Sequence, residues 1–181
     1  MRLILVLFVA VLSIMASEAQ ARRQFPAQEL KKARQLRVDR AEILEMGIYR
    51  AQARTARQNK NSPTGGIRAL ATVALVKRTA TIPPQRGMHF GIRYVLRGFP
   101  RGARVPIRIV QHYPKAGLHN PRTNKTTYVY RKSSFKTIGY PSFEGYHLGS
   151  DWELVPGIWR FEIWYMGRKL AEQAFELKAP E

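Results

Sequence analysis

The sequence predicts an all-β domain, an antiparallel sandwich of about seven or eight strands. Short runs of β-branched and aromatic residues alternate between two faces with the period of a strand, and turn residues separate these runs. No stretch shows a convincing long helical pattern, internal repeat or heptad. The ~160 residues that follow the N-terminal segment suffice for one domain with its own core.

The clearest element is a hairpin near the C-terminus. One face of its first strand carries the apolar residues Trp159, Phe161, Ile163 and Tyr165. Met166-Gly167 stands where the chain would reverse, because glycine tolerates the positive φ of a tight turn. Residues 168–177 then predict the return strand, with a helix as the alternative. Trp164, on the opposite face, is the one tryptophan of this run that we expect at the surface.

Earlier strands are predicted at residues 38–50, 67–81, 89–97, 104–110 and 126–130. Residues 51–66 and 112–125 are expected to be loops, and 136–148 a partly buried, interrupted segment. Proline cannot donate to a β-ladder, so Pro106 places its strand at a sheet edge or at a bulge. If 89–97 and 104–110 pair as a hairpin, the arginines of both strands would share one face of a sheet.

The N-terminus has the three parts of a secretory signal peptide. Met1-Arg2 precedes an apolar run from Leu3 to Met15, and Ala19-Gln20-Ala21 resembles a cleavage site. We expect a signal peptide over 1–21, a basic flexible or helical arm over 22–37 and the sandwich over 38–178. An uncleaved anchor is the alternative. The mature chain would be periplasmic or extracellular, without a transmembrane span, since a span needs about 20 apolar residues.

The mature part is strongly basic. The formal net charge is +19, there is no cysteine, and no acidic residue occurs between Glu45 and Glu144. Without cysteine the fold has no disulfide framework and depends on its hydrophobic core. A field of one sign attracts anions and is weakened by salt, although a merely solvated basic surface is the simpler interpretation.

Arginine matches phosphate and carboxylate geometry, and most of the basic residues are arginines. The candidates for anion binding are Arg93, Arg97, Arg104, Arg108, Arg122, Lys125, Arg131 and Lys132. We expect an anionic envelope component as the partner: a lipid head group, a lipopolysaccharide or an acidic polysaccharide. An envelope protein bound by a structural interaction module is the alternative. The signal peptide argues against an intracellular nucleic acid.

Ordinary catalysis has little support. There are four histidines, His89, His112, His119 and His147. His112 and His119 share a loop region but lack a nearby Asp, Glu or Cys in the sequence, so we predict no metal site, although copper or zinc binding across His112, His119 and His147 stays open. The acids Glu144, Asp151, Glu153 and Glu162 are the only candidates for a hydrolase pair. We predict no catalytic residue and no cofactor, and keep a polysaccharide hydrolase as a third interpretation.

Several segments resemble one known family. They are Met46-Gly47-Ile48-Tyr49, His89-Phe90-Gly91-Ile92-Arg93-Tyr94, Gly117-Leu118 with Asn120-Pro121, the run from Glu153 to Phe161, and Gly167-Arg168-Lys169-Leu170. In these segments the chain is similar to an uncharacterised family of exported bacterial domains of unknown function, from about Val38 to Leu177. The resemblance implies an immunoglobulin-like β-sandwich. It assigns no catalytic or ligand-binding residue to this chain.

Overall fold

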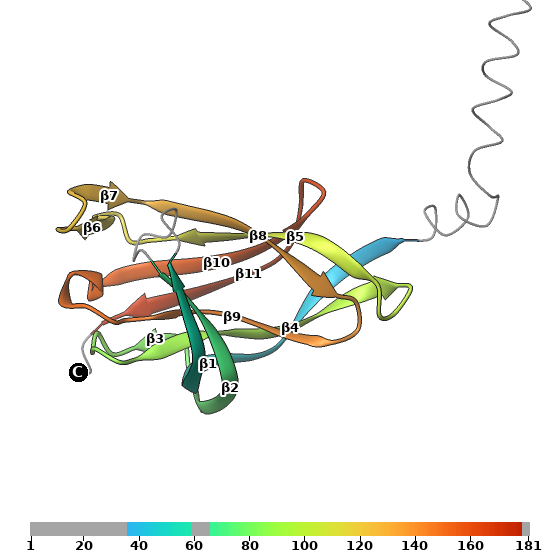
Figure 1. The fold of residues 1–181 in the computed structure, drawn as a ribbon, viewed down its shortest axis with the longest axis horizontal. Helices are drawn as coiled ribbons and strands as arrows, with labels where there is room; N and C mark the ends of the chain where they lie inside the picture. Colours follow the sequence, from blue (N-terminus) through green and yellow to red (C-terminus); the bar gives the residue numbers. More distant parts are fainter. Residues whose placement is uncertain (1–35, 59–65, 179–181) are drawn as a thin grey trace, which may run out of the picture. The chain divides into compact units, whose positions relative to one another are not determined.

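The computed structural model describes residues 36–58 and 66–178, with side chains for 36–50 and 73–178. It contains a four-stranded sheet A and a five-stranded sheet B that enclose one core (Figure 1). Sheet A has the order β2 (Gly66–Arg78), β1 (Arg37–Gln58), β4 (His89–Phe99) and β9 (Pro141–His147). Sheet B has the order β3 (Thr81–Ile82), β11 (Arg168–Leu177), β10 (Gly157–Tyr165), β5 (Arg104–His112) and β8 (Val129–Thr137). A small hairpin, β6 (Leu118–Asn120) with β7 (Lys125–Thr127), and the 3₁₀ turn η1 (Asp151–Glu153) complete the elements. The all-β sandwich prediction is confirmed, while the predicted signal peptide and nearly all of the predicted arm lie outside the described residues.

The C-terminal hairpin forms as predicted. β10 and β11 pair antiparallel across a two-residue turn, with Tyr165 opposite Arg168. Met166 and Gly167 have φ values of 46° and 79°. Positive φ at both central residues is the condition for a tight turn whose twist matches that of the strands. The helical alternative for 168–177 is wrong, since pairing with β10 overrides the helical spacing of the apolar residues.

The core is aromatic at its centre. Trp159 is fully buried, and its ring centroid lies 5.6 Å from that of Phe90 in sheet A, 4.8 Å from Tyr146 and 5.1 Å from Tyr113. The indole N–H donates to the Val155 carbonyl at 3.1 Å. The alternation of the terminal hairpin therefore places its large side chains between the sheets, as its period predicted.

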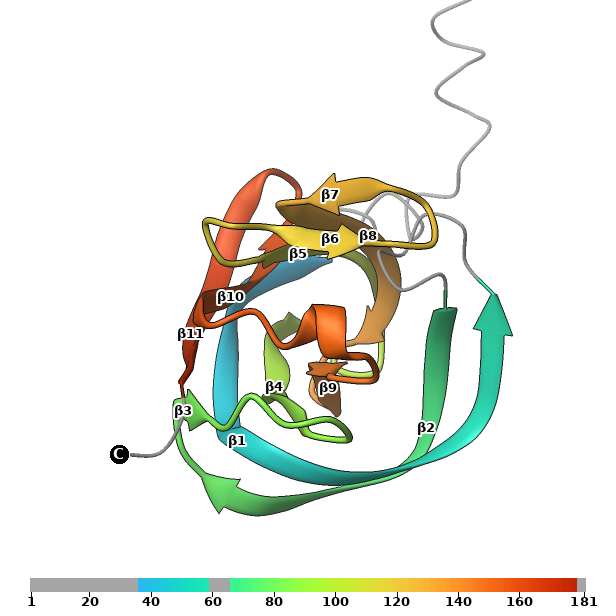
Figure 2. The ribbon, with the colours of Figure 1, turned by 90° about the vertical axis from the view of Figure 1, so that its left-hand side faces the viewer.

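β1 is longer than predicted and is bent by bulges. Its register with β4 shifts at Asp39 and at Leu44, and these shifts keep Val38, Ala41 and Ile43 directed to the core. Residues 51–58, expected in a loop, continue β1 and pair with β2. Figure 2 shows this β1–β2 hairpin curving around β4 and β9, the other two strands of sheet A.

β5 differs from its prediction in position. It lies inside sheet B, between β10 and β8, and its register with β8 runs without a shift through Pro106. Pairing with β10 covers only Arg108–His112, so Pro106 lies where β5 has one neighbour. The missing N–H is thus tolerated without an edge strand or a bulge. The expected loop 112–125 also contains β6, and the expected strand 126–130 is divided between β7 and β8.

Candidate anion-binding surface

The eight basic residues predicted to bind anions lie on four different parts of the domain. The outer face of sheet A carries Arg93 and Arg97, and the outer face of sheet B carries Arg104, Arg108 and Arg131. Lys132 points between the sheets. Arg122 and Lys125 lie in the β6–β7 turn region. β4 and β5 do not form the conditional hairpin, because the chain passes from one sheet to the other between them. The four strand arginines consequently do not share a face.

The sheet A arginines are engaged by neighbours. Arg97 Nε donates to Glu42 Oε2 at 2.8 Å, and Arg93 Nε lies 3.3 Å from Glu45 Oε2. Arg93 also donates to the carbonyl of Val73 in β2, at 2.6 Å. The hydrogen bond from Arg97 is the main cause that lowers the pKa of Glu42. Both arginines therefore link the strands of sheet A instead of presenting free charge.

Lys132 is engaged in the interior. Glu144, only 4% exposed, extends inward from β9, and its two oxygens lie 2.8 Å from Lys132 Nζ and 2.7 Å from Lys136 Nζ. Burial alone would raise the pKa of the Glu144 carboxyl, but the two ammonium groups outweigh that cost and hold its pKa below the ordinary value. The three charges join the edge strands β8 and β9 of the two sheets.

Arg104, Arg108 and Arg131, which we call the sheet B arginines, are exposed. They differ from Arg93, Arg97 and Lys132 in that no described carboxylate neutralises them. None of them has an ion pair with an acidic side chain among the described residues. Arg108 lies opposite Ser133 and Arg131 opposite Val110, so the two arginines are diagonal neighbours on one face. Diagonal neighbours lie about 7–8 Å apart, a separation from which two guanidinium groups can reach one oxyanion.

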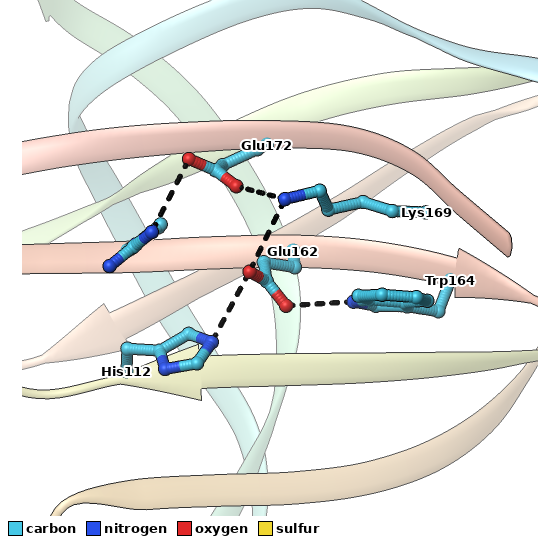
Figure 3. A network of polar contacts seen from close by, with 6 residues as sticks. His112, Glu162, Trp164, Lys169 and Glu172 are labelled. Carbon is cyan, nitrogen blue, oxygen red and sulfur yellow. Dashed lines mark hydrogen bonds and ion pairs between the residues drawn. The ribbon is translucent and has the colours of Figure 1, made fainter. Parts of the chain in front are cut away.

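A polar network fills the adjoining part of the same sheet face (Figure 3). Glu162 accepts a hydrogen bond from Trp164 Nε1 at 2.8 Å and lies 3.3 Å from His112 Nε2. Lys169 Nζ lies 3.7 Å from Glu162 and 2.6 Å from Glu172. Burial alone would raise the pKa of Glu162, but the contacts with Trp164, His112 and Lys169 outweigh burial and hold this pKa below its ordinary value. Both carboxylates are thus bound within the network and do not neutralise the sheet B arginines.

Sequence reasoning missed this network because its members come from three strands whose order is set by the fold. The alternation of the strand does place Glu162 and Trp164 on one face, and this was the only indication of the network in the sequence. Trp164, expected at the surface, is half-buried, and its indole N–H is used by Glu162.

The histidines occupy separate places. His112 faces Glu162, His119 Nδ1 lies 3.1 Å from Thr126 Oγ1, and His147 stacks on His89 with ring centroids 4.1 Å apart. Within the described residues no three His, Asp or Glu side chains are placed to hold a metal ion.

The acids considered for hydrolysis have separate structural partners. Glu153 accepts hydrogen bonds from the Tyr146 hydroxyl at 3.0 Å and from the Gly149 and Ser150 N–H groups. Asp151 is exposed and lies 3.6 Å from Arg86. Glu144 and Glu162 serve the two clusters described above. The four carboxylates therefore share no common partner, and the described geometry offers no support for a hydrolase pair.

The arrangement resembles a solved structure. A crystal structure at 1.50 Å of an immunoglobulin-like protein from Pseudomonas aeruginosa has a TM-score of 0.54 and 22% sequence identity, over 79% of this chain and 96% of that chain. At this identity the likeness establishes the immunoglobulin-like fold. No curated protein matches the chain. Across the described ranges, no helix is long and apolar enough to cross a membrane. The model of one family, described as "Domain of unknown function (DUF3859)", matches residues 37–177.

Proposed function

Because the chain belongs to the DUF3859 family of domains of unknown function and has an immunoglobulin-like fold, we propose that it is a non-enzymatic binding domain of the bacterial envelope whose sheet B arginines engage an anionic partner. Arg122 and Lys125, in the β6–β7 turn region, add exposed positive charge to the domain. The sequence of residues 1–21 supports export to the periplasm or the exterior.

One observation carries this proposal: among the arginines predicted to bind anions, Arg93 and Arg97 have Glu45 and Glu42 as neighbours. The sheet B arginines have no ion pair with a described acid, and two of them are diagonal neighbours on one sheet face. Unpaired guanidinium groups on a rigid sheet are preorganised for phosphate or carboxylate groups, and little side-chain entropy is lost for each hydrogen bond formed.

Replacing Arg104, Arg108 and Arg131 with glutamine should weaken binding to soluble polyphosphate by about tenfold or more at low salt, because each lost contact with a phosphate removes a charge-assisted hydrogen bond. Binding of the wild-type mature chain should itself decline steeply as salt rises. Both effects can be measured by fluorescence anisotropy with labelled polyphosphate over a salt series.

A matched control removes the same charge from other exposed positions: Arg50→Gln, Lys77→Gln and Lys115→Gln. It should bind polyphosphate nearly as the wild type does. Equal losses in the two variants would mean that net charge alone acts, and no binding by the wild type at low salt would refute the proposal. A protein partner captured with salt-insensitive affinity would instead favour the interaction module.

A further inference from the structure

Four exposed apolar side chains gather at one end of the sandwich, which we call the apolar end. They are Phe99 (51% exposed), Phe135 (62%), Tyr140 (52%) and Met166 (85%). Phe99 ends β4, Phe135 lies near the end of β8, Tyr140 follows in the β8–β9 turn, and Met166 is in the β10–β11 turn. In Figure 1 these turns lie at the same end as the start of β1. Water-exposed side chains of this size, concentrated at one place, indicate a contact surface.

Hydrogen bonds to backbone carbonyls hold the apolar end together. The Ile138 N–H donates to the Ala103 carbonyl at 2.9 Å, which joins the β8–β9 turn to the β4–β5 turn. The guanidinium of Arg168 donates to the carbonyls of Asp39 (2.8 Å) and Val38, which joins the β10–β11 hairpin to β1. The apolar side chains therefore project from a cross-linked base.

Arginines accompany these side chains. The Arg101 guanidinium lies 5.4 Å from the centre of the Tyr140 ring, and that of Arg104 lies 5.4 Å from the centre of the Phe135 ring. The acids at this end are occupied, since Asp39 lies 3.4 Å from Arg37, and Glu42 bonds with Arg97 as described above. An excess of positive charge thus surrounds the apolar groups.

We propose that the apolar end docks on an anionic lipid bilayer. Phe135, Tyr140 and Met166 enter the head-group region, and Arg101 and Arg104 bind lipid phosphates. Apolar tips with cationic groups beside them match the layered chemistry of a membrane interface, where aromatic rings lie at head-group level and basic residues meet phosphate. This inference rests on the proposed function and identifies the anionic partner as membrane lipid.

The placement of the apolar groups favours a bilayer over a soluble polyanion or a protein. The side chains project from separate elements, the end of β4, the end of β8 with the turn that follows it, and the β10–β11 turn, and a fluid surface accepts such separate projections. A soluble polyanion would leave them in water.

The test compares binding of the mature chain to phosphatidylglycerol–phosphatidylcholine vesicles and to soluble polyphosphate as salt rises. The variant carries Phe135→Thr, Tyr140→Ser and Met166→Asn, with asparagine chosen because it accepts the positive φ of the turn. At salt that abolishes polyphosphate binding, the wild type should keep part of its vesicle binding. The variant should lose that part by about tenfold or more, because buried apolar area is not screened by salt.

The control replaces exposed apolar residues elsewhere, with Val76→Thr, Tyr128→Ser and Ile158→Thr, and should bind vesicles as the wild type does. Thermal unfolding of each variant verifies that it is folded. Salt-resistant vesicle binding that is equal in the two variants, or absent from the wild type, would overturn the inference. The proposed function is tested separately, by the loss of polyphosphate binding in the sheet B arginine variant. A failure of that test can therefore be distinguished from a failure of the bilayer test.

Discussion

Replacing Glu144 with glutamine should lower the free energy of unfolding by about 3 kcal/mol at neutral pH. The change leaves Lys132 and Lys136 without the carboxylate that lies 2.8 and 2.7 Å from their ammonium groups. Removing one member of a buried charge cluster leaves the others uncompensated, and partial exposure of the lysines keeps the cost at the lower end of the usual range. Urea unfolding followed by tryptophan fluorescence measures the effect.

The same carboxylate makes stability depend on pH. The pKa of Glu144 is lower in the folded than in the unfolded chain. Its contribution is therefore present above the unfolded value of about 4.3 and is lost as the pH falls through the folded value. Wild-type stability should decline over this acid range, and the glutamine variant should show a smaller decline.

Glu176→Gln is the matched control, because Glu176 is exposed on β11 and the substitution removes the same charge. Its effect should stay within about 0.5 kcal/mol. Equal losses of stability for the two glutamine variants would show that the buried cluster contributes nothing beyond net charge.

Replacing Trp159 with alanine should lower the free energy of unfolding by about 3–5 kcal/mol. The indole is completely buried between the sheets, contacts the rings of Phe90, Tyr113 and Tyr146, and donates to the Val155 carbonyl. The substitution leaves a cavity that these rings, held by both sheets, cannot fill. Urea unfolding monitored by far-UV circular dichroism reports the loss without relying on the tryptophan signal.

Ile158→Ala provides the comparison within the same strand. Ile158 neighbours Trp159 but faces solvent, so its replacement should cost less than about 1 kcal/mol. Similar costs at the two positions would contradict the alternation on which the burial of this strand depends.

The sequence was most informative where local patterning is strong. In β10 every second side chain is large and apolar, and Met166-Gly167 marks the reversal, so strand, register and turn were all predictable. It was less informative for β1, where bulges at Asp39 and Leu44 break the alternation, and for residues 51–58, whose polar composition resembles a loop. Cross-strand pairing, which a local pattern does not record, decided those regions.

Local periodicity and composition were enough to predict the sandwich, the buried face of the terminal hairpin and the cationic character of the chain. Which charges remain free depends on the tertiary structure. Arg93 and Arg108 look alike along the chain, yet Arg93 lies in sheet A beside Glu45, whereas Arg108 lies in sheet B and has no ion pair with a described acid. Sheet assignment depends on contacts between distant strands, and those contacts paired one arginine and left the other available to a partner.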